Sequence, residues 1–533
     1  MSVLGNLLKS AWARLRRDPE AAGGIAAAAP RLEALRDAQP ATPPGTAFHA
    51  GLERLRAGDF PGAERHLSAA VEHAPGLPEA HFHLGIALAR QQRYEEAADC
   101  FVLATHFRPD FAEAHFQLGL AEFHRDRFDE ALASFRRATE LRPGYADAHC
   151  NLGYLLYKHL EQLDEAEEHL RRALALDPAS IDARTNLAMV LDHRGATDEA
   201  LAMYDRILEV APGDPEVRLN RALIRLMRAD YAQGWPDYEA RRSVQRQRAF
   251  PYPEWDGSSL AGRTILVHAE QGLGDEIMFA SCLGEVIARA GHCVVECHRK
   301  LEKLFRRSFP GATVHGALQT DADLAWLDRM PKIDCKIGIG SLPLHFRRSL
   351  ADFPRHTGYL KADATRVADW RARLDALGRG PKIGISWRGG AKKTRRHVRS
   401  IPLEQWGPLL AVPGVHFVSL QYTDCRAEIG AVESASGIRV HHWRDAIDEY
   451  DETAALVAAL DLVISVQTAV VHLAGALGKP VWALVSASPE WRYQKSGESL
   501  PWYPSVRLLR QSTPGDWQAV VNEARERLAA CRT

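Results

Sequence analysis

The fold of the first half of the chain is decided by a stretch that occurs twice in succession. Residues 81–109 read HFHLGIALARQQRYEEAADCFVLATHFRP, and residues 115–143 read HFQLGLAEFHRDRFDEALASFRRATELRP. Both contain a glycine, an alanine, a phenylalanine and a closing proline at positions that match with an offset of 34 residues. A glycine lets two helices approach closely, and a proline ends the second helix because it lacks a backbone N–H. The stretch therefore predicts a helical hairpin.

The same landmarks continue on both sides of this stretch. The small residue of the first helix recurs every 34 or 35 residues, at Gly51, Gly85, Gly119, Gly153, Ala188 and Ala222. A large apolar residue that we expect to fill the gap to the next hairpin follows in phase, at Leu67, Phe101, Phe135, Leu170, Tyr204 and Tyr238. The pattern resembles the tetratricopeptide repeat, whose period is 34 residues. It predicts an α-solenoid over residues 46–245.

A row of polar side chains keeps the same period. Two residues before each small landmark lie His49, His83, Gln117, Asn151, Asn186 and Asn220, all able to donate and accept hydrogen bonds. The first helices of such a solenoid line its concave surface. The O-linked N-acetylglucosamine transferases use an asparagine ladder at this repeat position to hold an extended peptide, so the resemblance implies an acceptor groove at Gln117, Asn151, Asn186 and Asn220. An ordinary solvated helix face is the alternative.

Composition narrows the class of protein. Lys and Arg number 67 against 68 Asp and Glu, so no overall field favours nucleic acid or an anionic membrane. No uncharged apolar run approaches the roughly 20 residues of a membrane span. Eight cysteines are too sparse for a disulfide scaffold and fit reduced thiols. We expect a cytoplasmic protein without a transmembrane segment, in which residues 1–45 form a short basic helix and a flexible lead-in.

After about residue 246 short β-branched runs alternate with helical stretches. The predicted strands are Arg263–Ala269, His292–Cys297, Lys382–Trp387, His416–Gln421, Leu460–Val466 and Pro480–Val485. Such alternation is typical of doubly wound parallel sheets, in which ligands bind at the carboxyl ends of the strands. We expect two Rossmann-like domains, over residues 246–378 and 379–533, that face each other across a cleft.

The loop after the first of these strands carries a candidate base. Gln271, Gly272 and Gly274 form a tight turn that can approach a substrate, and Asp275 follows at a helix start. Asp275 either caps that helix or removes a proton from an acceptor hydroxyl. A dinucleotide fingerprint needs a further glycine where Ile277 stands, so NAD binding is disfavoured.

Two segments of the second domain favour an anion. The loop Arg388–Ser400 is rich in lysine and arginine, and Arg388, Lys392 and Arg399 are candidates to clamp a diphosphate. A solvated basic loop or a nucleic-acid patch is the alternative. In Leu462–Gly475 a buried strand turns into a helix whose first amides favour an anion. The candidate side chains of this segment are Ser465, Gln467, Thr468 and His472.

These motifs together resemble the ADP-heptose:lipopolysaccharide heptosyltransferases over about residues 260–515. The resemblance implies the α/β GT-B glycosyltransferase fold, with an acceptor-side domain at 246–378 and a nucleotide-sugar-binding domain at 379–533. It also implies an inverting reaction without metal or cofactor. Asp275 matches that family's proposed base, Arg399 falls at its phosphate-side lysine, and Thr468 and His472 match its donor loop. Gln467 stands where that family has aspartate, which favours a different nucleotide sugar.

We therefore expect a glycosyltransferase that moves a sugar from a nucleotide-diphosphate sugar to a hydroxyl, on a protein held by the repeats. A non-catalytic repeat scaffold with a degenerate glycosyltransferase fold is one alternative, and a sugar-nucleotide epimerase is another. The sugar, the base and the acceptor (flagellin, another protein or a lipopolysaccharide precursor) stay open. An aromatic group that either stacks a base or forms core comprises Trp491, Tyr493, Trp502 and Tyr503.

Overall fold

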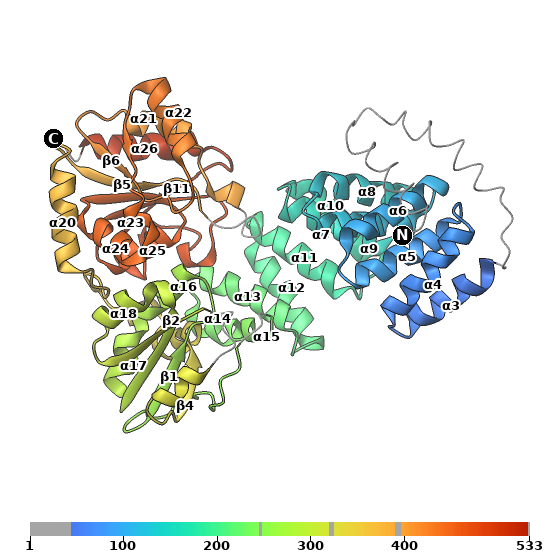
Figure 1. Cartoon of the computed structure of the whole chain (residues 1–533), viewed down its shortest axis with the longest axis horizontal. Helices are drawn as coiled ribbons and strands as arrows, with labels where there is room; N and C mark the ends of the chain where they lie inside the picture. Colours follow the sequence, from blue (N-terminus) through green and yellow to red (C-terminus); the bar gives the residue numbers. More distant parts are fainter. Residues whose placement is uncertain (1–43, 245–247, 319–323, 390–395, 531–533) are drawn as a thin grey trace. The chain divides into compact units, whose positions relative to one another are not determined.

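The computed structural model describes residues 44–244, 248–318, 324–389 and 396–530 (Figure 1). The expectations for the lead-in at 1–43 and for Lys392 lie outside these residues. The chain divides into two compact units, Met1–Met203 and Tyr204–Thr533. The division falls inside helix α12 (Thr197–Val210), although the repeat pattern itself continues to about residue 245.

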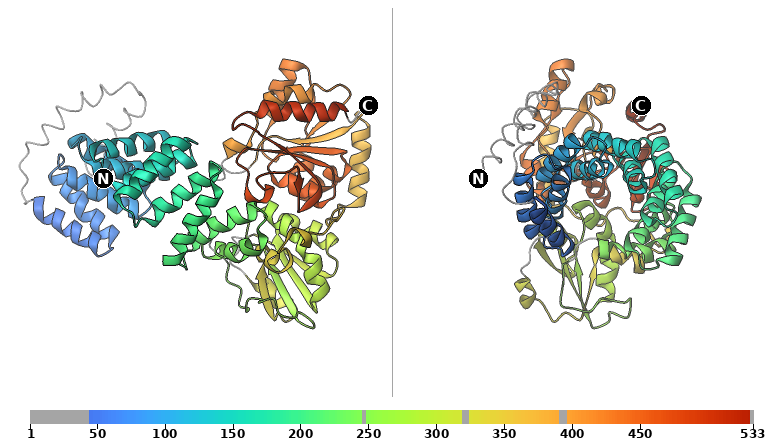
Figure 2. Two further views of the ribbon diagram at one scale, coloured as in Figure 1. Left: turned by 180° about the vertical axis from the view of Figure 1, so that it is seen from behind. Right: turned by 90° about the vertical axis from the view of Figure 1, so that its right-hand side faces the viewer.

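The described part of the first unit consists of helices that pair into hairpins, as the repeat predicts. In the right-hand view of Figure 2 these helices wind in an arc. Before α12 they are α3 (Pro44–Arg56), α4 (Phe60–His73), α5 (Pro78–Arg90), α6 (Tyr94–Phe107), α7 (Ala112–His124), α8 (Phe128–Leu141), α9 (Ala146–Lys158), α10 (Leu163–Leu176) and α11 (Ile181–His193).

The repeat glycines are where the two helices of a hairpin touch. A β-carbon at Gly85 would lie 2.6 Å from the Phe101 ring, and one at Gly119 would lie 2.6 Å from the Phe135 ring. Both phenylalanines are almost fully buried. The large apolar residue thus packs on the glycine of its own hairpin, whereas we expected it to fill the gap to the next one. These two hairpins require glycine because the aromatic ring takes the space of a side chain.

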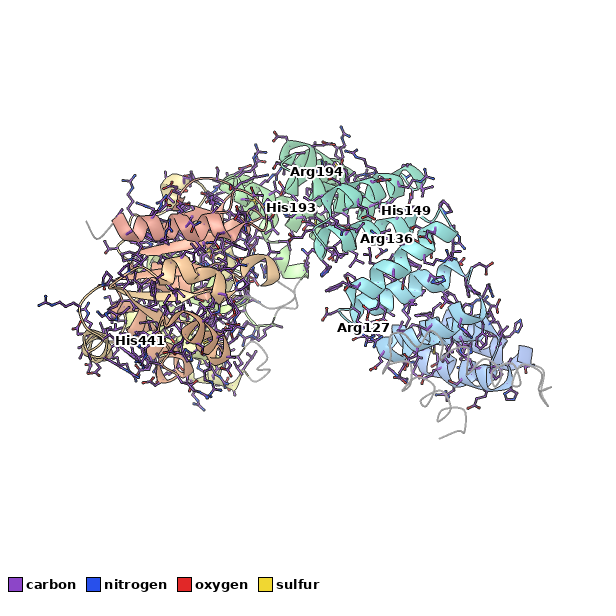
Figure 3. The ribbon with its side chains drawn as sticks, turned by 90° about the horizontal axis from the view of Figure 1, so that it is seen from above. Arg127, Arg136, His149, His193, Arg194 and His441 are labelled. Carbon is purple, nitrogen blue, oxygen red and sulfur yellow. The ribbon has the colours of Figure 1, made fainter. Side chains whose placement is uncertain are left out.

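Ion pairs join successive hairpins on the surface of the first unit. Arg93 lies 2.7 Å from Glu64, and Arg136, labelled in Figure 3, lies 2.7 Å from Glu165. Arg136 belongs to α8 and Glu165 to α10, so the contact connects neighbouring repeats. All four side chains are partly exposed, and each pair therefore contributes at most about 1 kcal/mol. Burial of the apolar landmarks dominates the stacking.

The last hairpin belongs to the second unit and is anchored to its first sheet. It comprises α13 (Pro215–Met227) and α14 (Tyr231–Tyr238), followed by α15 (Arg241–Val244). The fully buried Arg241 donates to Glu270 over 2.7 Å and to Ser341 over 2.6 Å. A buried charge requires such partners. The end of the repeats is therefore built into the first α/β domain.

The first sheet is parallel throughout, as the alternating pattern predicts. Its strand order is β3-β2-β1-β4, and Ile265 of β1 pairs with Cys293 of β2 and Cys335 of β4. The strands are β1 (Thr264–His268), β2 (His292–His298), β3 (Ala312–Ala317) and β4 (Cys335–Gly338). Its helices are α16 (Leu273–Phe279), α17 (Leu283–Arg289), α18 (Glu302–Ser308) and α19 (Leu342–Phe346).

The second sheet has the order β10-β11-β9-β8-β5-β6-β7 and is parallel except for the β10–β11 pair. Its strands are β5 (Lys382–Ser386), β6 (His416–Ser419), β7 (Val440–His441), β8 (Leu462–Val466), β9 (Val481–Val485), β10 (Ser499–Leu500) and β11 (Tyr503–Arg510). Its helices are α20 (Ala364–Asp375), α21 (Gly407–Leu410), α22 (Arg426–Ser436), α23 (Asp445–Asp448), α24 (Tyr450–Ala459), α25 (Ala469–Ala476) and α26 (Trp517–Ala530).

The segment between the sheets ties them together. Helix α20 precedes β5 but packs on α24, because the Trp370 indole N–H donates to Glu452 over 2.8 Å. Upstream of α20, the Tyr359 backbone N–H donates to the Ala476 carbonyl at the end of α25 over 2.8 Å. The Tyr359 hydroxyl donates to the Ile277 carbonyl of α16 over 2.6 Å. One residue thus holds a helix of each domain.

The aromatic group of the second unit is buried in the core, and of its rings Tyr493 also lines the cavity of the candidate site. Trp491, Tyr493, Trp502 and Tyr503 are each at most 7% exposed. Trp235 of α14 contacts Trp491 with 5.6 Å between the ring centroids. These rings join the last repeat hairpin to both sheets. Within the described ranges no helix has the length and apolar character needed to cross a membrane.

Candidate functional site

Two helices that begin at strand ends cross beside each other in the second unit. Helix α16 follows β1 of the first sheet, and α25 follows β8 of the second; they lie side by side in Figure 1. A β-carbon at Gly274 would lie 3.1 Å from His472 and 3.4 Å from the Ala469 Cα atom. Since ligands of parallel sheets bind at the carboxyl ends of strands, this crossing is the expected place for a site.

A cavity of about 720 Å³ lies at this crossing and is lined from both domains. The structure brings the following predicted residues into its wall: Gly272, Gly274, Asp275, Arg399, Gln467, Thr468 and His472. The cavity wall also contains residues that were not predicted, among them Lys300, Tyr422, Tyr450, Glu490 and Arg492. The cavity volume is of the size that takes a small organic ligand.

A chain of alternating charges crosses the cavity wall. The Asp275 Oδ1 atom pairs with Arg492 Nη2, and Arg492 Nη1 pairs with Glu490. The other Glu490 oxygen pairs with Arg399 Nη1. The side chain of Arg399 is 8% exposed and that of Arg492 is 15% exposed. Two guanidinium groups are therefore held together by two carboxylates, which balance their charge.

The turn after β8 is built by hydroxyl groups. Thr468 caps α25, because its side chain accepts from the Val470 backbone N–H over 3.2 Å. The fully buried Ser465 hydroxyl lies 3.1 Å from that of Thr468 and donates to the Val466 carbonyl. Ser465 does not line the cavity. Its position supports the turn, whereas Thr468 reaches the cavity wall itself.

Gln467 brings a buried amide to the cavity with one hydrogen-bonding atom unused. The side chain is 3% exposed, and its Oε1 atom accepts from the Ser486 hydroxyl over 3.1 Å. Its Nε2 atom has no hydrogen-bond partner among the residues that the structure describes. Leaving a buried donor unsatisfied costs about 1–3 kcal/mol. An acceptor oxygen on a ligand in the cavity would remove that cost.

His472 is a neutral group in this site. Burial, together with the charge of Arg492, lowers the pKa of its imidazole to about 3. Its Nδ1 atom lies 3.1 Å from the Tyr503 hydroxyl, which fixes the ring. At neutral pH His472 therefore offers hydrogen bonds but no positive charge. Arg399 and Arg492, which also line the cavity, carry positive charge instead.

Two predicted residues turn away from the cavity. The Arg388 guanidinium lies 3.2 Å from Glu428 and donates to the Asp424 carbonyl over 2.8 Å. The Gln271 amide donates to the Tyr238 hydroxyl of α14 over 2.9 Å. Neither lines the cavity. Both contacts hold loops in place around it.

Sequence reasoning missed Glu490, Arg492 and Glu276. Glu490 and Arg492 follow β9, which pairs with β8, so sheet order would have pointed to them. Glu276 is fully buried beside Asp275 and accepts from the His298 backbone N–H over 2.8 Å. Burial raises its pKa to about 8. It fixes α16 to the end of β2, and no sequence signal separated it from an ordinary surface glutamate.

The polar row of the repeats lies on the first helices of the hairpins. In the first unit the Asn186 amide of α11 lies 3.6 Å from Cys150 Sγ of α9, so these helices are neighbours. The Asn151 amide donates to the Asp147 carbonyl one turn earlier over 2.9 Å. Gln117 is half-buried on α7, and Asn220 belongs to the second unit. No group of three or more His, Cys, Asp or Glu in the described ranges could hold a metal ion.

Comparison with protein families identifies the repeats. Residues 48–105 and 159–226 match families described as Tetratricopeptide repeat, and residues 119–159 match one described as TPR repeat. Protein FlbA of Caulobacter vibrioides (strain ATCC 19089 / CIP 103742 / CB 15) is 34% identical over 345 residues, or 61% of this chain. This chain spans 57% of the length of that relative.

Two solved structures are similar in part. A thermophilic tetratricopeptide-repeat protein of Thermus thermophilus is 25% identical with a TM-score of 0.29, covering 34% of this chain and 100% of its own. MamA of Desulfovibrio magneticus RS-1 is 25% identical with a TM-score of 0.30, covering 32% of this chain and 95% of its own. The family matches, together with the helical hairpins, show that the N-terminal half of this chain carries a tetratricopeptide-repeat solenoid.

Proposed function

We propose that this chain is a glycosyltransferase of the GT-B fold that moves a sugar from a nucleotide-diphosphate sugar to a hydroxyl group of a protein. One observation carries the proposal: a single cavity at the strand ends of two parallel sheets holds the Asp275 carboxylate together with Arg399 and Arg492. A carboxylate and two guanidinium groups in one cavity suit a reaction in which one reactant loses a proton and another gains negative charge.

In the proposed reaction Asp275 takes the proton of the acceptor hydroxyl, and the hydroxyl oxygen bonds to the anomeric carbon of the donor sugar. The bond from that carbon to the diphosphate breaks, and the nucleoside diphosphate leaves with the bonding electrons. Arg399, Arg492 and the first backbone amides of α25 stabilise its charge. These groups supply the positive charge, so the proposed reaction uses neither a metal ion nor a cofactor.

The Gln467 amide affects which nucleotide sugar can bind as the donor. Its unused Nε2 donor lies in the cavity wall, where an oxygen of the donor substrate can accept from it. A neutral amide stands here where the heptosyltransferases have aspartate. We therefore propose a nucleotide sugar other than ADP-heptose.

The repeats support a protein as the acceptor. Tetratricopeptide repeats present an extended concave surface for a partner chain. Gln117, Asn151 and Asn186 lie on first helices of the first unit, and amides can hold a peptide backbone without reading its sequence. Asn220 occupies the equivalent position in α13.

The test begins with thermal unfolding of the full chain against a panel of nucleotide sugars. A donor that binds the folded protein raises the melting temperature by mass action. Transfer and hydrolysis of that donor are then measured for the wild type and for Asp275→Asn. We expect the variant to keep donor binding and lose at least about a hundredfold in transfer rate.

The matched control is Asp256→Asn, which alters an exposed carboxylate of the same domain whose hydrogen bond to Ser258 an asparagine can keep. It should behave as the wild type. Donor binding without any turnover would favour the repeat scaffold. Interconversion of the sugar without an acceptor would favour an epimerase.

A further inference from the structure

We infer that Arg492 binds the diphosphate of the donor, and that this binding releases Asp275 for catalysis, so that the donor must bind before the acceptor is deprotonated. The inference rests on the proposed function, because it assigns Asp275 the part of the base. It adds to that function the order in which the donor binds and the acceptor loses its proton. It also adds a role for Arg492, which none of the sequence motifs contains.

The contacts of Arg492 are the first evidence. One terminal nitrogen of its guanidinium pairs with Asp275 and the other with Glu490, while its Nε atom is buried without a hydrogen-bond partner among the described residues. A guanidinium has five N–H donors arranged in a fork that fits the oxygens of a phosphate. Arg492 therefore has donor capacity that its two carboxylate partners do not use.

The charge pattern is the second evidence. Glu490 bridges Arg492 and Arg399, so two like charges stay close only because a carboxylate lies between them. Two guanidinium groups held by a shared anion make a preformed pair for a larger anion with more oxygens. The neighbouring Gln467 Nε2 donor, in a side chain 97% buried (3% exposed), also lacks an acceptor among the described residues. Both features indicate an oxygen-rich anion as the ligand.

The contact between Asp275 and Arg492 lets binding of the diphosphate control the reaction. Its Oδ1 atom is engaged by Arg492 and is therefore not available to take the proton of an acceptor hydroxyl. Nε and the Nη2 atom that holds Asp275 share one edge of the guanidinium, so a diphosphate that binds this edge takes Nη2 from Asp275, whose Oδ1 atom can then accept a proton. Asp275 and the diphosphate thus compete for the same guanidinium.

Competition of this kind can be tested by titration calorimetry with inorganic pyrophosphate and the full chain. Arg492→Gln should weaken pyrophosphate binding at least tenfold, as expected for the loss of charge-assisted hydrogen bonds. Asp275→Asn should tighten binding severalfold, because the competing charge is removed. In the double variant Asp275→Asn should bring no such gain, since its effect acts through Arg492.

Arg492→Lys, which keeps the charge without the fork, should bind pyrophosphate with intermediate affinity. Arg444→Gln, at an exposed arginine next to α23, is the matched control and should leave affinity unchanged. Thermal unfolding of each variant checks that it is folded. Wild-type affinity in Arg492→Gln, or unchanged or weaker binding in Asp275→Asn, would overturn the inference.

The experiments distinguish failure of the proposed transferase activity from failure of the inference about Arg492 and Asp275. If no nucleotide sugar supports transfer but pyrophosphate binding follows Arg492 and Asp275 as stated, the diphosphate site stands and the transferase does not. If transfer occurs but Asp275→Asn does not tighten pyrophosphate binding, the transferase stands and the ordered release of Asp275 is wrong.

Discussion

Gly274 of α16 lies so close to His472 of α25 that a β-carbon at Gly274 would come within 3.1 Å of the imidazole Cδ2 atom. Each helix begins where a parallel strand ends, one strand in each sheet. The missing side chain at Gly274 therefore lets the two strand ends share one cavity, and places Asp275 beside Arg492.

Enlarging Gly274 should separate the two helices. We expect Gly274→Val to lower the free energy of unfolding by about 1–3 kcal/mol, since overpacking must shift α16 or α25. Donor turnover should fall as well, because Asp275 moves with α16. Gly284→Ala is the control, because Gly284 is exposed on α17 with open space around its Cα. This variant should raise the free energy of unfolding by up to about 1 kcal/mol. Urea unfolding and transfer assays measure both, and wild-type values for Gly274→Val would contradict the packing account.

The repeat glycines offer a second test of packing. Gly119→Ala should lower the free energy of unfolding by about 1–3 kcal/mol, because the methyl group would lie 2.6 Å from the Phe135 ring. Gly144→Ala, in a loop with no atom within 4 Å of the new methyl group, should be nearly neutral. Circular dichroism during urea unfolding distinguishes the two. Equal effects would mean that the glycine has no special part in the hairpin.

Two arginines of one loop should differ in their effect on anion binding. Arg399→Gln should weaken pyrophosphate binding about tenfold or more, since Arg399 lines the cavity. Arg388→Gln should change binding little, because its guanidinium pairs with Glu428 outside the cavity wall. Titration calorimetry at one salt concentration measures both. A larger loss in Arg388→Gln would overturn the placement of the anion.

The buried imidazole of His472 should make the free energy of unfolding depend on pH. Its folded pKa is about 3, below the ordinary value of 6.5, so the unfolded state binds the proton more readily as the pH falls. The part of the folding stability that depends on the neutral imidazole is fully present above pH 6.5 and is progressively lost as the pH falls toward 3. Between pH 7 and pH 5 the wild type should lose about 2 kcal/mol more than His472→Gln does. Urea unfolding at each pH measures the difference.

Tyr503→Phe is the control for that experiment. It removes the hydroxyl beside His472 Nδ1 but leaves the imidazole buried, so the acid dependence should persist. If His472→Gln kept the wild-type acid slope, the group responsible would lie elsewhere, for example at the buried His268, whose pKa burial lowers to about 4.

The polar row of the repeats should affect binding of the protein acceptor but not the reaction of the donor. Replacing Asn151 and Asn186 together by alanine should raise the KM for a protein acceptor about thirtyfold, since the two lost hydrogen bonds contribute about 1 kcal/mol each. Donor hydrolysis without acceptor should not change. Arg65→Ala, at an exposed position of the second helix α4, is the control. An unchanged KM would favour the solvated helix face.

What the sequence determined by itself is local. The landmarks at Gly85 and Phe101 predicted the hairpin because a helix fixes which residues share a face, and the family matches confirm the repeats. Likewise, the alternation of strands and helices predicted parallel pairing, since a crossover helix returns the chain to the same end of the sheet, and every strand pair except β10–β11 is parallel. The residues at strand ends, Asp275 and Thr468, could be named for the same reason.

Only the tertiary structure decided which of those residues meet. Arg492 is 217 residues from Asp275 in the chain, and no spacing rule connects a guanidinium after β9 with a carboxylate after β1. Arg388 and Arg399 stand in one basic loop, yet one turns to Glu428 and the other to Glu490. Long side chains pair with whichever charge folding brings near, so their partners depend on contacts between elements far apart in the sequence.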